Sequence, residues 1–432
     1  MPPVSYNDSE DLLAERKRNF ASSLSVSYAN VKPLTMVRAK GQYINNVPHI
    51  GHCDERVVRA VSEMMATISP CKLSLAVELL DFGTNTRYLH PVRQQLAKEL
   101  LSTFPAPLTK VFLVNSGSEA NDLALRLARA YTKKTKTIAV ERGYHGTTSL
   151  TISVSPYKLR KFKQGSSTPQ PDWLSIIGCP STPVAAAESL QMLRQEASKD
   201  EHGLCAFICE SGMSVAGVVL PPDGFMREAY GVVHSHGGLC IADEVQVGLG
   251  RMGTHFWGFE QQGVVPDIAT IGKPLGNGFP CVEYFSTFGG NTVSCAAALA
   301  VLRAIKEDSL QDHARDVGEV LKEELRRARR ETPHIGAVRG SGLFVGVEIV
   351  ETTSTERPPS LAPHIASQLV ARLLLDHNML TTLDGPGEGV LVIKPSMCFS
   401  EDNARTLVCG ITQVLTAIDA EGGGRQYQSI PT

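Results

Sequence analysis

Short apolar runs alternate with glycine-containing turns and helical stretches along much of the chain. They predict strands at residues 111–114, 137–140, 205–209, 239–242 and 268–271. Because the runs are almost continuously apolar, they are typical of strands covered on both faces in a parallel sheet. Residues 120–131 carry apolar side chains at helical spacing and predict a helix after the first strand. This order indicates an α/β fold with a mostly parallel sheet covered by helices.

After about residue 300 the pattern changes to longer amphipathic helices. Helices are predicted around 317–325, 365–374 and 401–420, with strands at 343–350 and 390–393. Such a mixture predicts a smaller α+β domain. A helix at 8–20 and a loop-rich stretch precede the large domain. We therefore expect an arm at 1–55 that contributes to the small domain, a large domain at 56–300, a small domain at 301–420 and a tail at 421–432.

Composition narrows the function classes. The chain has 432 residues and a net charge of -2, which excludes a general nucleic-acid binder and a basic membrane-surface protein. No apolar run is long enough to span a bilayer. Asp8, Glu10 and Asp11 occupy the N-terminus without an apolar segment, which argues against a secretory signal. Ten cysteines without a CxxC pair fit reduced thiols in the cytoplasm or the mitochondrial matrix.

One lysine occupies a chemically interesting place. Lys273 follows the predicted strand 268–271 across Gly272, and a loop rich in proline and glycine comes after it. An amine at the edge of a buried strand loses solvent, which lowers its pKa. A neutral amine held in this way can form a Schiff base with an aldehyde. Taken alone, the residue also fits a solvated loop lysine.

The turn before the predicted helix 120–131 has the composition of an anion site. Gly117 and Ser118 leave backbone N–H groups accessible, and the helix dipole adds positive potential. The Ser118 hydroxyl adds a donor for a phosphate. An ordinary N-cap, in which a serine is followed by acids, fits this stretch equally well.

An acid is expected at the carboxyl end of another strand. Asp243 ends the run 239–242, where ligands bind in open α/β sheets. A buried carboxylate needs a cationic partner, and either a pyridinium nitrogen or a structural arginine such as Arg251 meets this need. Gln246 is placed to reach a ring hydroxyl.

Further side chains follow other strand ends. Tyr144 comes after the run 137–140 and is suited to stack on a flat ring, although a lone aromatic residue is also common in a core. Glu210 ends the run 205–209 as a second acid, and Thr287 lies in a turn with free backbone donors. Together the strand ends predict a phosphate cradle, a ring stacker, an acid for a ring nitrogen and an amine for an aldehyde. Pyridoxal 5'-phosphate is the cofactor that carries all four partners.

The same stretches resemble class III pyridoxal-phosphate aminotransferases. The resemblance rests on residues 115–122, 144–146, 243–250, 272–278 and 287–291, and it extends from about residue 34 to residue 420. It implies fold type I of the pyridoxal-phosphate-dependent transferases. It also implies a role for each candidate residue: Lys273 as the Schiff-base lysine, Asp243 at the ring nitrogen, Gly117 and Ser118 at the phosphate, Tyr144 on the ring with His145 beside it, and Gln246 near the ring oxygen. Thr287 would reach the phosphate of the neighbouring subunit's cofactor, which implies a homodimer. No metal ligand is implied.

Within this family the chain is similar to the phospho-lyases that act on ethanolamine phosphate or 5-phosphohydroxylysine. The likeness lies in residues 44–49, 84–90, 155–158, 384–386 and 394–395. It implies a phosphorylated amine as substrate and aldehyde, ammonia and phosphate as products. Ordinary members carry an arginine before the final proline motif that grips an α-carboxylate, and phospho-lyases usually carry a lysine there, but this chain has Val392. A class III aminotransferase of the alanine–glyoxylate type is the alternative.

The chain departs from the family pattern in three places. A β-hairpin is missing between residues 43 and 44, residues 68–83 form an insertion, and a strand with a helix is missing between residues 280 and 281. In the family that strand is antiparallel and lies inside the large sheet. Its loss predicts unpaired backbone groups and an open apolar groove. An inactive isoform that lacks part of the large sheet is therefore a further hypothesis.

Overall fold

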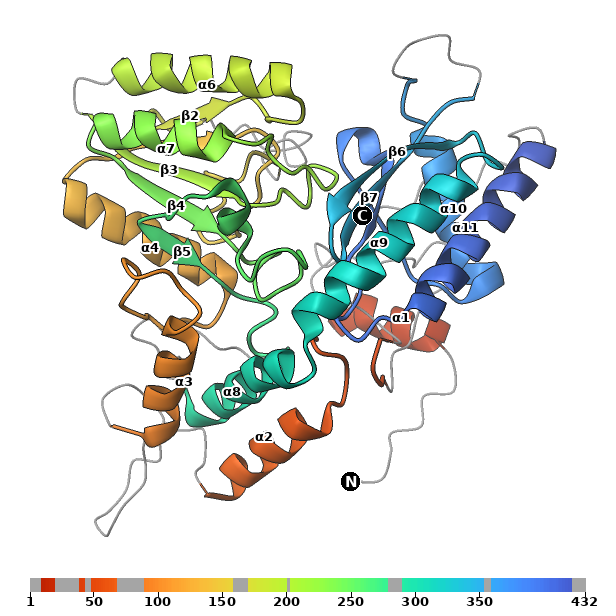
Figure 1. Ribbon diagram of the computed structural model, residues 1–432, viewed down its shortest axis with the longest axis horizontal. Coiled ribbons are helices and arrows are strands. Elements are labelled where there is room, and N and C mark those ends of the chain that lie inside the picture. Colours follow the sequence, from red (N-terminus) through yellow and green to blue (C-terminus); the bar gives the residue numbers. More distant parts are fainter. Residues whose placement is uncertain are drawn as a thin grey trace.

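The computed structural model describes residues 9–19, 39–42, 48–67, 89–157, 170–199, 203–278, 290–352 and 359–421. Two separate sheets organise these residues, each with its own helices (Figure 1). Among the described helices none is both long enough and apolar enough to cross a membrane.

The larger sheet is parallel and has the strand order β2-β1-β3-β4-β5 within the described residues. Its strands are β1 (Lys136–Val140), β2 (Leu174–Ile177), β3 (Leu204–Glu210), β4 (Leu239–Asp243) and β5 (Ile268–Thr270). In β3, Phe207 and Cys209 pack towards α6 (Pro183–Ser198) and α7 (Phe225–Ser235). Ala206 and Ile208 pack on the opposite face with α4 (Gly117–Thr132). The predicted parallel sheet with helices on both faces is confirmed.

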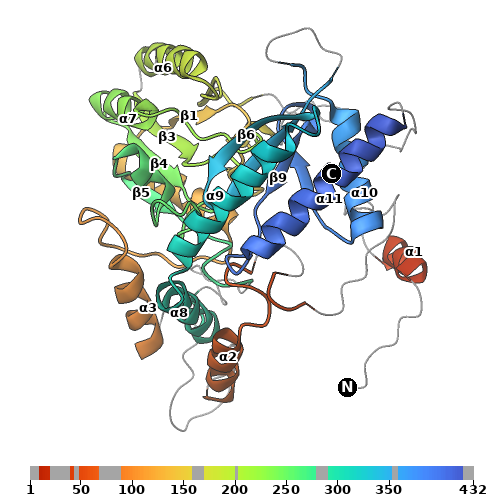
Figure 2. The same ribbon diagram turned by 45° about the vertical axis from the view of Figure 1, so that its right-hand side comes forward.

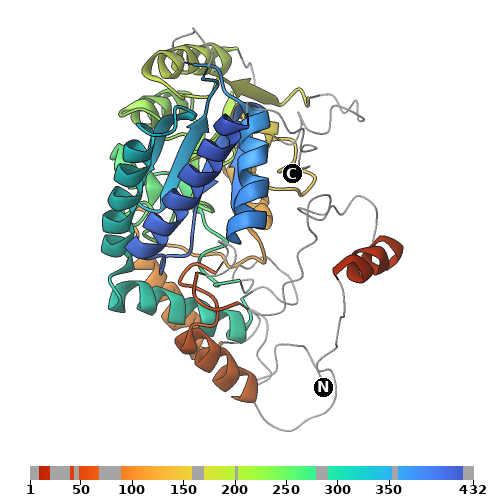
Figure 3. The same ribbon diagram turned by 90° about the vertical axis from the view of Figure 1, so that its right-hand side faces the viewer.

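The smaller sheet is antiparallel, with the order β6-β7-β9-β8. It consists of β6 (Ile335–Ser341), β7 (Phe344–Ile349), β8 (Thr382–Asp384) and β9 (Val390–Ile393). Helices α9 (Leu310–Ala328), α10 (Pro363–His377) and α11 (Glu401–Ala420) lie side by side over it (Figure 3). This half of the chain matches the predicted α+β pattern, and the helix predicted at 401–420 has the predicted bounds.

Strand β9 shows how the smaller sheet meets the larger one. Leu391 and Ile393 pack beneath the helices of the small sheet. Val390 and Val392 point to the opposite face, because side chains alternate along a strand. There they join a cluster of buried residues from the small sheet and from loops of the large sheet: Val218, Val247, Met252 and Phe344. Even-numbered positions of β9 therefore face the larger sheet.

Three helices connect the two sheets. They are α2 (Glu55–Thr67), α3 (Pro91–Leu101) and α8 (Thr292–Glu307), which pack together below the sheets in Figure 1 and again in Figure 2. Because α8 continues through residue 300, we propose that the domain boundary lies at its end, at Asp308, and not at the predicted position. Helix α1 (Ser9–Asn19) and the short helices η1 (Gly258–Gln262) and η2 (Pro386–Glu388) complete the described elements.

The described residues 39–42 and 48–54 of the N-terminal arm contact both halves of the chain. Gly41 and His52 form a bridge, Gln42 donates a hydrogen bond to Asn403 in α11, and the Met397 N–H donates to the His49 carbonyl. His49 is also 2.8 Å from the Leu249 carbonyl, in a loop of the large sheet. These contacts favour the proposal that residues before α2 contribute to the small domain.

The predicted strand at 111–114 is wrong. Residues 111–114 form no strand, and β5 is the edge of the large sheet as far as the described residues go. An apolar groove of about 300 Å³ lies between the two segments, lined by residues that include Leu123, Leu127 and Ile268. Phe112 is 61% exposed. An apolar run becomes a strand only where a neighbour supplies the hydrogen-bond ladder. The departures at 43–44, 68–83 and 280–281 lie outside the described residues.

Candidate active site

The carboxyl ends of three parallel strands meet in register. Glu210 in β3 pairs with Asp243 in β4, and Asp243 pairs with Thr270 in β5. Lys273 follows β5 after a turn of two residues. The register therefore brings two acids and the candidate amine to one edge of the sheet, as the sequence predicts.

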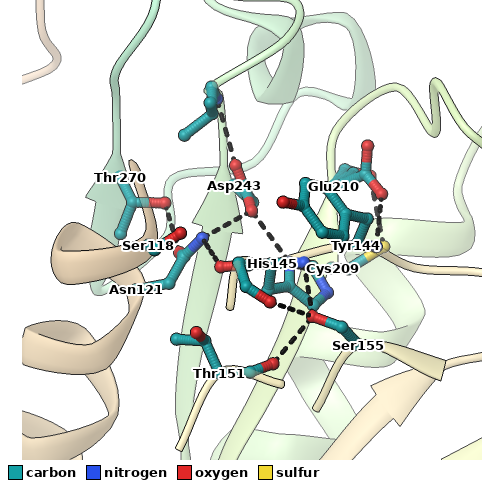
Figure 4. A network of polar contacts seen from close by, with 12 residues as sticks. Ser118, Asn121, Tyr144, His145, Thr151, Ser155, Cys209, Glu210, Asp243 and Thr270 are labelled. Carbon is teal, nitrogen blue, oxygen red and sulfur yellow. Dashed lines mark hydrogen bonds and ion pairs between the residues drawn. The ribbon is translucent and has the colours of Figure 1, made fainter. Parts of the chain in front are cut away.

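Asp243 is the centre of a buried hydrogen-bond network (Figure 4). Its side chain is 3% exposed, Oδ2 accepts a hydrogen bond of 2.7 Å from the Asn121 amide, and Oδ1 accepts one of 3.0 Å from the Val245 N–H. The His145 Nδ1 atom lies 2.8 Å from Oδ2. Asn121 is itself held, since it donates to the His145 carbonyl and accepts from the Thr270 hydroxyl. Several donors thus stabilise the carboxylate in the core.

Arg251 does not pair with Asp243. Its guanidinium donates to the Leu343 and Pro395 carbonyls and lies 3.2 Å from the His49 ring. Burial, together with the nearby Arg251 charge, lowers the pKa of His49 to about 3, so His49 stays neutral. Arg251 therefore joins the arm to the small sheet. The Asp243 carboxylate is not paired with Arg251 and can interact with a different cation.

Lys273 has the environment of a nucleophile. Its side chain is accessible to solvent, yet the surrounding protein atoms desolvate the amine and lower its pKa. The negative charges of Asp243 and Glu210 act in the opposite direction and raise it. An accessible amine with a lowered pKa has a larger neutral, reactive fraction at neutral pH than an ordinary lysine.

The start of α4 carries the residues of the predicted anion site. Ser116 is the N-cap, and its hydroxyl accepts a hydrogen bond of 3.1 Å from the Glu119 N–H. The Glu119 carboxylate accepts one of 2.7 Å from the Asn115 N–H. Among the described residues the Gly117 and Ser118 N–H groups have no partner. The N-cap is therefore compatible with the predicted anion site, because the cap uses Ser116 and not Gly117 or Ser118.

Glycines bring this turn against the lysine turn. A Cβ atom on Gly272 would lie 3.4 Å from the Gly117 Cα atom, and one on Gly117 would lie 3.0 Å from both methyl groups of Val245. A Cβ on Gly146 would lie 2.7 Å from the Ser118 Cα atom. The loops after β1, β4 and β5 therefore touch the first turn of α4, and side chains larger than hydrogen would separate them.

Tyr144 and Glu210 lie on the other side of the network (Figure 4). Glu210 accepts hydrogen bonds from the Tyr144 and Ser214 N–H groups at 2.9 and 3.2 Å. Burial raises the pKa of Glu210 to about 7. The Tyr144 ring is half-buried and meets the Tyr157 ring edge-on, with centroids 6.4 Å apart. The hydrogen bond from the Tyr144 N–H to Glu210 fixes the backbone position from which the Tyr144 ring projects.

Gln246 comes close to a lysine from the smaller sheet. The Lys394 ammonium donates a hydrogen bond of 2.6 Å to the Ser214 hydroxyl and lies 3.5 Å from the Gln246 side-chain oxygen. Of the other predicted residues, Thr287 lies outside the described residues.

Two residues of the site were missed from sequence. Asn121 lies four positions after Gly117 in α4, so helical spacing places it on the same face, and this spacing was a usable signal. Ser214 follows β3 in a loop, and no local pattern marks it.

These groups fit pyridoxal phosphate. The Gly117–Ser118 turn offers N–H donors for a phosphate, Asp243 offers a buried carboxylate for a ring nitrogen, and Lys273 offers an amine for an aldehyde. The His145 Nε2 atom is buried and has no hydrogen-bond partner among the described residues. The donor set matches the phosphate, the ring and the carbonyl carbon of that cofactor.

Comparisons with known proteins agree with this chemistry. The family model described as aminotransferase class-III matches residues 42–415. A Drosophila melanogaster protein named alanine–glyoxylate aminotransferase 2-like is 41% identical over 433 residues, which cover 90% of this chain and 84% of the relative. The Caenorhabditis elegans ethanolamine-phosphate phospho-lyase homolog 1 is 35% identical over 461 residues, covering 95% of this chain and 94% of the relative.

A solved structure is similar over nearly the whole chain. It is a phospholyase from Arthrobacter in complex with phosphoethanolamine, with a TM-score of 0.82 and 30% sequence identity. The match covers 94% of this chain and 100% of the other. Together with the family model, this likeness confirms the predicted fold type I and the predicted cofactor class.

Proposed function

Because the chain belongs to the class III aminotransferases, a family of pyridoxal-phosphate enzymes, we propose that it is a phospho-lyase. Its substrate would be a vicinal amino-alkyl phosphate such as ethanolamine phosphate or 5-phosphohydroxylysine. The observation that carries this proposal is Val392, which is 3% exposed and packs among Val218, Val247 and Phe344. No cation stands at the position where ordinary members grip an α-carboxylate, so an amine without that carboxylate fits better.

The reaction moves one proton from the amine-bearing carbon to the adjacent carbon, and phosphate departs from that adjacent carbon. Bound pyridoxal phosphate supplies a carbonyl carbon that takes up the substrate amine and a ring that accepts an electron pair. Lys273 removes the proton from the amine-bearing carbon. Asp243 would keep a proton on the ring nitrogen. The positive charge on that nitrogen stabilises the electron pair that remains on carbon after Lys273 has removed its proton. The carbon–oxygen bond on the adjacent carbon then breaks, and its electron pair leaves with phosphate.

Hydrolysis completes the balance. One water supplies the oxygen of the aldehyde, and the amine nitrogen leaves as ammonia. Gly117 and Ser118 would hold the cofactor phosphate, Tyr144 would cover one face of the ring, and His145 and Gln246 would border its edge. No oxo acid enters the reaction, because the amine nitrogen is released and not passed on.

The direct test is to incubate the holoenzyme with ethanolamine phosphate and to follow phosphate and acetaldehyde. We expect release of both in equal amounts without any oxo acid, and none from Lys273→Ala. Turnover that required pyruvate or glyoxylate, with alanine or glycine as a product, would contradict the phospho-lyase proposal.

That second outcome is the alternative function. The 41% identity to the alanine–glyoxylate aminotransferase 2-like protein supports it. In that reaction the same amine and acid would serve, and the nitrogen would pass to an oxo acid. The two functions differ in the fate of the nitrogen, so an assay for free ammonia separates them.

Because an apolar groove lies beside β5, membership of the family does not by itself establish that this chain is active. Its activity therefore needs a test of its own. If the open edge of the sheet abolished the cofactor site, the folded protein would bind no pyridoxal phosphate. We expect an absorbance band of bound cofactor in the wild type that is lost in Lys273→Ala. A folded protein without this band would support the inactive isoform.

We further propose a homodimer in which Thr287 reaches the partner's cofactor, as the family likeness implies. Sedimentation measurements on the holoenzyme test the dimer, and weaker cofactor binding by Thr287→Ala tests the contact. The cytoplasm or the mitochondrial matrix remains the proposed compartment. Relatives from Arabidopsis thaliana and Homo sapiens are named as mitochondrial aminotransferases, and localisation of a tagged full-length chain decides between the two.

A further inference from the structure

Lys394 enters the active site from the smaller sheet. It lies directly after β9, two positions beyond Val392. Because Val390 and Val392 face the larger sheet, the alternation of side chains places Lys394 on the same face. Position 392 carries no cation in this chain, but Lys394 follows two residues later and lies on the same face of the strand.

The contacts of Lys394 place its amine beside the reaction site. It donates to Ser214, whose own N–H is bonded to Glu210, and it approaches Gln246 in the loop after β4. Lys273 is close enough for its charge to lower the pKa of Lys394. The amine thus sits between the loops that carry the predicted ring contacts and the nucleophile.

The charge of this amine is poorly compensated. The two bonded oxygens belong to neutral side chains, and no carboxylate of the described residues lies within ion-pair distance. The pKa of Lys394 is lowered to about 8, chiefly by burial; the charges of Asp384 and Glu210 act to raise it, and those of Lys273 and Arg251 act to lower it. A partly buried ammonium without a counter-ion is costly, and an arriving anion removes that cost.

We propose that Lys394 binds the phosphate group of the substrate and so selects phosphorylated amines. The inference rests on the proposed function and adds a specificity residue to it. A phosphate fits better than a carboxylate, because proteins hold planar carboxylates with the fork of an arginine, whereas a lysine acts as a point charge on a compact anion. The ammonium can rotate its donors from Ser214 and Gln246 to the phosphate oxygens.

The experiment compares Lys394→Met, Lys394→Gln and Lys394→Arg in the holoenzyme. For the Met and Gln variants we expect a KM for ethanolamine phosphate at least 10-fold above that of the wild type, with the absorbance of bound cofactor unchanged. The Arg variant keeps the charge and should recover most of the affinity. Lys134→Met is a matched control, because Lys134 is also partly buried and bonded to a neutral oxygen, the His236 carbonyl, far from the site.

A binding measurement separates this inference from the proposed function. Calorimetry with inorganic phosphate on the holoenzyme should show an affinity that the Met variant loses at least 10-fold and the Lys134 variant keeps. If the wild type turned over no phosphoamine but bound phosphate through Lys394, the phospho-lyase proposal would fail and the anion site would stand.

Two results would overturn the anion site. One is an unchanged KM and an unchanged phosphate affinity in the Met and Gln variants. The other is loss of bound cofactor in all three Lys394 variants, the Arg variant included, because it would show that the lysine positions Gln246 and the cofactor and does not bind the substrate. Should the Met variant fail to fold, the Gln and Arg variants give the same comparison of charge against no charge.

Discussion

The packing of Gly117 against Val245 allows a quantitative test of the candidate phosphate turn. In Gly117→Ala the new methyl group would lie 3.0 Å from both methyl groups of Val245, which is closer than side chains normally approach. Val245 is 8% exposed, which leaves its side chain little room to turn away, and its N–H holds the Asp243 carboxylate at 3.0 Å, so a backbone shift there would move the acid. Overpacking of this kind costs about 1–3 kcal/mol.

The cost should appear in cofactor binding, because the cofactor requires the turn and the acid in their native places. If all of it weakens the holo state, the dissociation constant for pyridoxal phosphate rises about 5- to 150-fold. Equilibrium dialysis or an absorbance titration of the cofactor-free protein measures this constant. Gly231→Ala is the matched control, since a Cβ there meets no atom within 4 Å and the residue lies inside α7.

Rescue makes the test specific. Val245→Ala removes the methyl groups that the new side chain strikes, so the double variant should recover cofactor affinity to within about threefold of Val245→Ala alone. Wild-type affinity in Gly117→Ala would refute the predicted close contact. A double variant as weak as the single one would show that the loss arises elsewhere than at Val245.

Three further predictions follow from the same contacts. Asn121→Ala removes the 2.7 Å hydrogen bond to the Asp243 carboxylate. The free energy of unfolding, measured by denaturant titration, should therefore fall by about 1.5–3 kcal/mol. An unchanged unfolding midpoint would contradict a stabilising role of the network. The KM for ethanolamine phosphate should stay level just below pH 8 and rise about tenfold per pH unit above it. The reason is that the pKa of Lys394 is about 8 and only its protonated form attracts an anion. The same rise of KM in Lys394→Arg would assign the pH dependence to another group. Phe112→Ser should change the free energy of unfolding by no more than about 0.5 kcal/mol, because the side chain is 61% exposed; a loss of several kcal/mol would restore the predicted core strand.

The sequence alone determined four of the five described strands of the large sheet and the residues at their ends, but not β2. Runs at 137–140, 205–209, 239–242 and 268–271 all became strands, because a strand buried on both faces is encoded by a short continuous apolar stretch. Each run also determined which residue follows it, and ligands bind at the carboxyl ends of such strands. Asp243 and Lys273 could therefore be predicted as partners although 29 residues separate them.

Only the tertiary structure decided contacts that depend on a neighbour. The run 111–114 has the composition of a strand, but without a ladder partner among the described residues it stays a groove wall. Arg251, a candidate partner of Asp243 from sequence, binds backbone carbonyls instead. Lys394 joins the site because the register of β9 and the packing of two sheets aim it there, and such information is spread over distant segments rather than carried by the local pattern.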